Sequence, residues 1–403
     1  MTTTSLRQRL AATALAGTLL LTGCAAGTSA ATDTAASTST TTTSSTSSST
    51  TTVTEAAAAA ETSESATTAE TIAATAEAME AFLATLSEEQ QDAVLYAYDD
   101  ETRTTSWSNF PVTFVERAGL NLADLTEEQQ VAAMGVLEAL LSDEAYATVV
   151  GIIGGDEYLA ENSSSTESSL GQYYIAFFGD PADTAFAVQY GGHHLGLNAA
   201  LDASAGTITF APTHLGVQPA VYTNEEGEEV QPFDGIYTDA FAFFDSLTAE
   251  QQATLTSGEV STCSPGDTCD FATGSGLQGS DLTEEQRVLL LDLLANWVGM
   301  ADEQTTDAAL AEIEATLDDT VVAWSGETTY DMTAGDGISF SVSGPDVYVA
   351  LQAQDGSAGA DVEGVTTSGW GHVHTIYRDP SNDYAGVVEQ QAATGMAGGP
   401  GGA

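Results

Sequence analysis

Four copies of one short phrase constrain the fold of this chain most strongly. In each phrase Ser or Thr stands three positions before Gln, so the hydroxyl can cap a helix while the Gln side chain reaches back to the capping residue. Acidic residues between the two suit the partial positive charge of a helix N-terminus. The phrases predict helices over residues 87–98, 127–141, 249–256 and 284–299, and they read Leu86-Ser-Glu-Glu-Gln-Gln91, Leu125-Thr-Glu-Glu-Gln-Gln130, Leu247-Thr-Ala-Glu-Gln-Gln252 and Leu282-Thr-Glu-Glu-Gln-Arg287.

Between these helices the hydrophobic pattern changes to the two-residue alternation of strands, with glycine or proline in the intervening turns. Helices that precede and separate groups of strands, without regular strand-helix alternation, are typical of an α+β fold. We expect a mostly antiparallel or mixed sheet with the capped helices packed against it, in a single folded domain over residues 71–390. The predicted strands cover residues 173–178, 184–190, 207–210, 320–324, 338–342, 347–351 and 372–377.

Histidines are the candidate functional residues, because the chain has five of them and four stand in two glycine-flanked motifs. The first motif is Gly191-Gly-His-His-Leu-Gly-Leu-Asn198, and the second is Gly371-His-Val-His-Thr-Ile-Tyr-Arg-Asp379. If the two motifs meet in the fold, they form one polar site. The candidate ligand-binding residues are His193, His194, Asn198, His372, His374, Arg378 and Asp379, while the membership of His214, which follows Pro212-Thr213 in a predicted turn, stays open.

Strand geometry limits which of these histidines can act together. Residues two apart share a face, so His372 and His374 can point at one ion, whereas His193 and His194 face opposite ways on a regular strand. We interpret His193 as a core residue and His194 as the partner of the downstream pair. A bulge at Gly191-Gly192 would relax this restriction.

The chemistry of imidazole makes a metal site one interpretation of the motifs. Imidazole suits zinc, iron or copper, and the predicted ligands are His194, His372 and His374, with Asp379 as a possible carboxylate. Three protein ligands and an open position would allow the metal to activate water. The alternative is that the histidines are hydrogen-bonded supports of the core.

The sequence gives little support for catalytic or binding motifs other than the histidines. Arg378 and Asp379 could bind an anionic group through the guanidinium, or they could pin a loop. Trp324-Ser-Gly326 lacks the glycine pattern of a catalytic serine elbow, and Gly191-Gly192 is too short for a phosphate-binding loop. The sequence therefore assigns no catalytic residue.

An ordered set of motifs resembles the family known as domain of unknown function 3500. The resemblance covers about residues 71–386 and implies an uncharacterised protein of the exported bacterial type, with no activity or ligand to carry over. It also implies an apolar residue at the position of His214. The motifs are Tyr173-Tyr-Ile-Ala-Phe-Phe-Gly-Asp-Pro181, Gly191-Gly-His-His-Leu-Gly-Leu-Asn198, Pro212-Thr-His-Leu-Gly-Val-Gln-Pro219, Trp324-Ser-Gly326, Ser343-Gly-Pro345 and His372-Val-His-Thr-Ile-Tyr-Arg-Asp-Pro-Ser-Asn-Asp-Tyr384.

The first residues are typical of an export signal, with Arg7 and Arg9 before a short apolar run. Leu21-Thr-Gly-Cys24 resembles a bacterial lipobox, which implies cleavage of residues 1–23 and a lipid on Cys24 that anchors the chain to the membrane, facing outward from the cytoplasm. An ordinary secretory peptide is the alternative. Residues 24–70 are rich in Ser, Thr and Ala and predict a disordered linker, and residues 391–403 predict a disordered tail.

Composition excludes some partners. The chain has 59 acidic and six basic residues, all arginine, so nucleic acid is not an expected partner. Each arginine beyond the signal segment should find an acidic partner; these are Arg103, Arg117, Arg287 and Arg378. Outside the cytoplasm, Cys263 and Cys269 most simply form a structural disulfide.

Three hypotheses for function follow. The first is an exported, lipid-anchored metal-dependent hydrolase or oxygenase with a histidine-built site. The second is a non-catalytic cell-surface module that binds a metal or a small solute. The third is a structural interaction domain in which the histidines only support the core.

Overall fold

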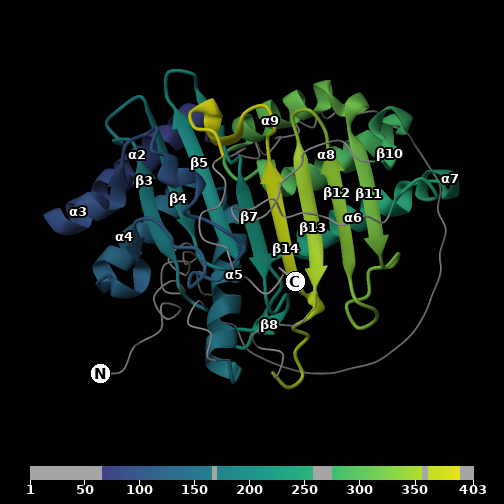
Figure 1. Cartoon of the computed structure of the whole chain (residues 1–403), viewed down its shortest axis with the longest axis horizontal. Coiled ribbons are helices and arrows are strands. Elements are labelled where there is room, and N and C mark those ends of the chain that lie inside the picture. Colours follow the sequence, from purple (N-terminus) through teal and green to yellow (C-terminus); the bar gives the residue numbers. More distant parts are fainter. Residues whose placement is uncertain (1–65, 166–169, 257–274, 356–361, 391–403) are drawn as a thin grey trace, which may run out of the picture. The chain divides into compact units, whose positions relative to one another are not determined.

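The computed structural model describes residues 66–165, 170–256, 275–355 and 362–390 (Figure 1). The predictions for the signal peptide, the linker up to residue 65, lipidated Cys24, the Cys263–Cys269 disulfide and the tail over 391–403 fall outside these residues. No helix in the described ranges is both long enough and apolar enough to cross a membrane.

Capping boxes start the helices where the sequence predicts them. Ser87, Thr126, Thr248 and Thr283 each accept a hydrogen bond from the backbone N–H of the Gln three positions later, and the side-chain oxygen of that Gln accepts one from the backbone N–H of the capping residue. A fifth box, at Thr67, starts a helix at Thr68, ahead of the expected domain start at residue 71. The helices are α2 (Thr68–Ala84), α3 (Glu88–Val94), α4 (Glu127–Leu140), α5 (Asp143–Asn162), α6 (Asp234–Ser246), α7 (Ala249–Gln252), α8 (Glu284–Val298) and α9 (Glu303–Ala315).

Helix α3 ends earlier than predicted because its continuation joins the sheet. Residues Leu95 and Tyr96 form strand β1 (Leu95–Tyr96), which pairs in parallel with Phe177 and Phe178. A strand pairing with a buried neighbour thus overrides the local helical pattern of residues 95–98.

One 12-stranded sheet organises the described chain, in the order β1-β3-β4-β5-β7-β14-β13-β12-β11-β10, with β2 paired to β3 and β6 paired to β5 (Figure 1). All its pairings are antiparallel except β1 with β3, which confirms the predicted α+β class with a mostly antiparallel sheet. A separate pair consists of β8 (Tyr222–Thr223) and β9 (Glu229–Val230). The strands of the large sheet beyond β1 are β2 (Leu120–Asn121), β3 (Tyr174–Phe178), β4 (Ala185–Gly191), β5 (Leu195–Asp202), β6 (Thr207–Thr209), β7 (Thr213–Val217), β10 (Leu277–Gln278), β11 (Val321–Gly326), β12 (Ile338–Ser343), β13 (Tyr348–Gln354) and β14 (Gly369–Arg378).

Strand β14 shows how the two faces of the sheet differ. Thr375 accepts a hydrogen bond from the indole Nε1 of Trp297 on α8, at 2.9 Å, so this face packs against the helix. His372, His374 and Ile376 alternate with Thr375 and therefore point to the other face. On that face Ile376 packs with Trp107 in a buried cluster. The face opposite α8 is where the histidines gather.

Candidate functional site

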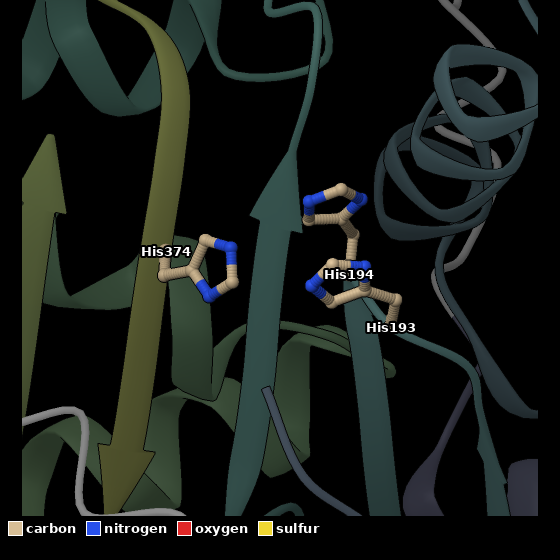
Figure 2. Close-up of side chains that lie close together, drawn as sticks. All are labelled: His193, His194 and His374. Carbon is tan, nitrogen blue, oxygen red and sulfur yellow. The ribbon is translucent and has the colours of Figure 1, made fainter. Parts of the chain in front are cut away.

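All five histidines of the chain converge, although the two motifs are separated by about half of the sequence. The ring of His374 lies 5.9, 5.2, 5.1 and 5.0 Å, between centroids, from those of His193, His194, His214 and His372. Figure 2 shows His374 pointing from β14 toward the neighbouring rings of His193 and His194. The expected meeting of mid-chain and carboxyl-terminal histidines is present.

A tight turn brings His193 and His194 together. Antiparallel strands β4 and β5 pair with Gly191 opposite Gly196, and Gly192–His194 form the connection. The two imidazoles stack, with centroids 4.3 Å apart and planes 10° from parallel. The expectation that they face opposite ways was therefore wrong, because the segment is a turn and the alternation of a regular strand does not apply. His193, interpreted from sequence as a separate core residue, belongs to the cluster.

Backbone contacts fix this turn in place. The guanidinium of Arg117 donates to the Gly192 carbonyl at 2.8 Å, and the backbone N–H of Gly216 on β7 donates to the His194 carbonyl at 2.7 Å. Gly216 also leaves space for the imidazole, because a Cβ there would lie 3.2 Å from Cδ2 of His194. Arg117 thus binds carbonyl oxygens, including those of Ser108 and Phe110, where the sequence predicted an acidic partner.

Gly191 tests whether this turn positions the site. A Cβ at Gly191 would lie 2.1 Å from the backbone oxygen of Leu195, a clash that only a backbone shift could relieve. We expect Gly191→Ala to lower the free energy of unfolding by roughly 2–4 kcal/mol, measured by urea denaturation. Gly135→Ala is the matched control, since Gly135 lies in α4 with nothing within 4 Å of a new Cβ. That substitution should gain up to about 1 kcal/mol, and equal losses in both variants would contradict the assignment.

A buried carboxylate orients His194. Nδ1 of His194 donates a hydrogen bond to Oδ1 of Asp156 on α5, and the hydroxyl of Tyr173 donates to Oδ2 of Asp156 at 2.6 Å. The two side chains of the pair are 0% and 1% exposed. Since the ionised carboxylate only accepts, Nδ1 carries the proton and Nε2 carries the lone pair. This carboxylate-histidine arrangement is the one that orients metal-binding imidazoles in proteins.

A second chain of hydrogen bonds orients the ring of His374. Nδ1 of His372 lies 3.2 Å from the carbonyl oxygen of Asp355, which can only accept, so this nitrogen is the donor. Nε2 of His372 is then the acceptor for Nε2–H of His374, 3.0 Å away. The remaining lone pair of His374 is on Nδ1. His372 therefore orients the ring of His374 through this hydrogen bond.

Within the residues that the structure describes, four buried ring nitrogens have no hydrogen-bond partner: Nδ1 of His193, Nε2 of His194, Nε2 of His214 and Nδ1 of His374. One ring nitrogen each from His193, His194 and His374 lies within 4.8 Å of the others. Nitrogen ligands of a tetrahedral zinc ion lie about 3.4 Å apart, given zinc-nitrogen bonds of about 2.0–2.1 Å. The three nitrogens would have to move closer together than the 4.8 Å limit to bind one such ion.

Burial keeps the histidines neutral. It lowers the pKa of His194 and His214 to about 3 and that of His372 to about 4, and it places the pKa values of His193 and His374 well below 6.5, helped by neighbouring histidines. Burial also raises the pKa of Asp156 to about 6, an effect that His193 and the Tyr173 hydroxyl oppose. At neutral pH the lone pairs are consequently available beside an ionised carboxylate.

The other candidates from the sequence are engaged elsewhere. Asn198 accepts from Gln189 at 2.6 Å and donates to the Pro212 carbonyl at 3.0 Å. The carboxylate of Asp379 accepts from the backbone N–H groups of Ser381 and Asn382, as a turn-forming residue does. The carboxylate that contacts the histidine cluster belongs to Asp156, and Asp379 is not part of the cluster.

Arg378 and His214 have supporting positions. Arg378 pairs with Asp383 at 2.7 Å and lies 5.8 Å from the Trp107 ring, as expected for the interpretation in which it pins a loop. His214 is on β7, not in a turn, and its Nδ1 donates to the Thr375 carbonyl at 2.8 Å. It stands behind His374 as a hydrogen-bonded support of the cluster.

Sequence reasoning missed Asp156 and Tyr173. Helix α5, which carries Asp156, follows no Ser/Thr-x-x-Gln phrase, although Ser142 caps it. The available signal was weak: Asp156 and Glu157 follow the apolar and glycine-rich run from Val149 to Gly155, and a charge beside such a run needs a partner when it is buried.

Fold and site together define an α+β protein with a buried cluster of five histidines and one carboxylate. The chain belongs to the family described as Protein of unknown function (DUF3500), whose model matches residues 68–386. No curated protein and no solved structure matches it.

Proposed function

We propose that this chain is a metalloprotein in which Nδ1 of His193, Nε2 of His194 and Nδ1 of His374 bind one divalent transition metal. The observation that carries the proposal is the convergence of three buried, neutral imidazoles, each with one ring nitrogen that has no partner in the described chain. An unpaired buried polar atom costs about 1–3 kcal/mol, so three in one place call for a common ligand. Asp156, Tyr173 and His372 orient the ligands.

Zinc and hydrolysis fit this set best. Iron oxygenases commonly use two histidines and a carboxylate, but here both oxygens of Asp156 are engaged by His194 and Tyr173. Three imidazoles with an open fourth position are typical of catalytic zinc, which lowers the pKa of bound water to about 7. Copper and iron remain alternative metals, and a closed, non-catalytic metal-binding module is the alternative function.

The location of this activity is part of the proposal. The basic and apolar segment before Cys24 and the lipobox-like Leu21-Thr-Gly-Cys24 support export and lipid anchoring, with the following Ser/Thr-rich stretch as a tether. We therefore propose a membrane-anchored enzyme acting on a small molecule outside the cytoplasm.

Elemental analysis of the purified full chain tests the metal site. We expect about one zinc, iron or copper per chain in the wild type and less than about a tenth of that in His194→Ala or His374→Ala, because each variant removes one of three ligands. Trp297→Phe is the matched control: it removes the hydrogen bond to Thr375 on the same strand and touches no ligand. Metal near zero in the wild type after reconstitution would overturn the site.

Hydrolysis assays then separate an enzyme from a binding module. A panel of ester, phosphoester and peptide substrates should reveal turnover that chelation abolishes and one equivalent of zinc restores. A protein that holds its metal but turns over none of these would instead support the closed, non-catalytic module.

A further inference from the structure

Arg103 is a buried cation without a counterion in the described chain. It lies in the short 3-10 helix Glu101–Thr104, its side chain is 0% exposed, and none of its three guanidinium nitrogens has a hydrogen-bond partner within that part of the chain. The sequence predicted an acidic partner here, and Arg287 and Arg378 do have theirs in Asp318 and Asp383. A buried charge of this kind destabilises the folded state strongly unless it is paired.

An aromatic ring and a network of hydrogen bonds surround Arg103. Its guanidinium carbon lies 5.4 Å from the centroid of the Tyr384 ring. The Tyr384 hydroxyl accepts from Trp107 at 2.9 Å and donates to Gln390 at 2.6 Å. Gln390 in turn donates to the Thr104 carbonyl at 2.7 Å, next to Arg103 itself. The aromatic face stabilises the cation partly but cannot neutralise it.

The backbone beside this cation is strained. Tyr384 and Ala385 have φ of 55° and 57°, in the left-handed region that residues with a Cβ rarely adopt. Consecutive strained residues persist where the surrounding structure fixes them, and such positions cluster at binding sites. The strained segment carries the Tyr384 ring that lies over Arg103.

Tyr98 and Ala385, the residue that follows Tyr384, line a cavity of about 410 Å³, while Arg103 and Tyr384 themselves are not among its lining residues. The Tyr98 phenol and the Arg103 guanidinium are close enough to influence each other's pKa, although burial is the main cause of both shifts. Asp202, Glu312, Asp346 and Asp379 also line the cavity. Their carboxylates repel phosphate and other multivalent anions more strongly than small monovalent ones.

We infer that Arg103, the Tyr384 ring and Tyr98 form a binding site for one small monovalent anion, either a halide or the carboxylate of a short organic acid whose chain extends past Tyr98 into the cavity. Such an anion would supply the missing charge and the missing acceptors. The site is separate from the histidine cluster and does not depend on the metal proposal.

Anion-dependent thermal unfolding of the full chain tests this inference. In buffers of constant ionic strength balanced with sulfate, chloride and bromide should raise the Tm of the wild type saturably, by roughly 2–5 °C. Arg103→Met should lose this dependence. Arg287→Met, which removes a partly exposed arginine paired with Asp318, should keep it. The same shift in wild type and Arg103→Met, or no shift in either, would overturn the site.

A second measurement distinguishes the source of the anion and does not need the variant to fold. The ³⁵Cl NMR line of chloride should broaden with the wild-type protein, and formate, acetate and butyrate should reverse the broadening if carboxylates share the site. Tighter competition by butyrate indicates an organic acid in the cavity, and competition by bromide alone indicates a halide site. Absence of excess broadening, or a bromide anomalous-scattering peak located away from Arg103, contradicts the inference.

Discussion

Acidification of the metal-free protein is expected to destabilise it steeply below about pH 6.5. The histidines are neutral in the folded state, with the pKa of His194 and His214 at about 3 and that of His372 at about 4. In the unfolded chain histidine titrates near 6.5, so below that pH the unfolded state binds more protons than the folded state. Each such histidine then lowers the free energy of unfolding by about 1.4 kcal/mol per pH unit, until the folded pKa is reached.

Asp156 acts with the opposite sign. Its folded pKa of about 6 exceeds the ordinary 3.8, so between these values the folded state holds a proton that the unfolded state releases. It therefore offsets about one histidine over that window. Relief of the net charge of −53 also favours the folded state on acidification, since the carboxylates repel one another. The effect of the histidines must for this reason be measured as a difference between two proteins.

His214→Leu provides that difference. It removes one buried histidine and installs the apolar residue that the family resemblance implies, at the cost of the hydrogen bond to the Thr375 carbonyl, about 1 kcal/mol. Urea unfolding in EDTA from pH 7 to pH 4 should give a slope against pH that is shallower than the wild-type slope by about 1.4 kcal/mol per pH unit. Parallel curves would mean that His214 is not buried in its neutral form.

Local chemistry explains which parts of the fold could be predicted. Both hydrogen bonds of a capping box form within four residues. The helix starts could therefore be predicted without knowledge of the rest of the molecule, at Ser87, Thr126, Thr248 and Thr283. Strand alternation is equally local, and β12 (Ile338–Ser343) begins at the residue expected from it. Helix α3 was predicted too long because β1 gains its stability from Phe177 and Phe178, far away in sequence.

The site was predictable only in outline. His372 and His374 share a face because they are two apart on a strand, and their meeting with His194 follows from rare residues in glycine-flanked motifs. The stacking of His193 on His194 depends on the turn at Gly192, which the alternating pattern did not reveal. Asp156 could not be singled out among 59 acidic residues, because its role comes from burial on α5.

The partners of the arginines could likewise be predicted only in part. An acidic composition predicts an acidic partner for every arginine, and Arg287 and Arg378 have one. Arg117 instead meets carbonyl oxygens in the turn that carries His193 and His194, and Arg103 meets an aromatic ring. Which partner a buried cation finds depends on tertiary packing, and composition does not contain that information.

Metal loading is expected to be the largest single stabilisation of this protein. An ion that binds the folded state alone stabilises it by RT ln(1 + [metal]/Kd), about 4 kcal/mol at 1,000 times Kd. The metal-free protein should accordingly unfold at a lower temperature than the zinc-loaded protein, and the Tm of the loaded protein should rise with zinc concentration. His194→Ala should lose this dependence, because the three-nitrogen set is broken.

Asp156→Asn is the sharper test, because it keeps the shape of the hydrogen-bonded relay and removes its charge. The amide oxygen can still accept from Nδ1–H of His194, but it makes the imidazole a weaker ligand, so zinc affinity should fall about 10- to 100-fold in competition with a chelator of known affinity. Trp297→Phe controls for loss of a buried hydrogen bond at β14 and should bind zinc as the wild type does. Unchanged affinity in Asp156→Asn would assign Asp156 to the support of the fold alone, whereas a loss in both variants would trace the effect to general loosening of the core.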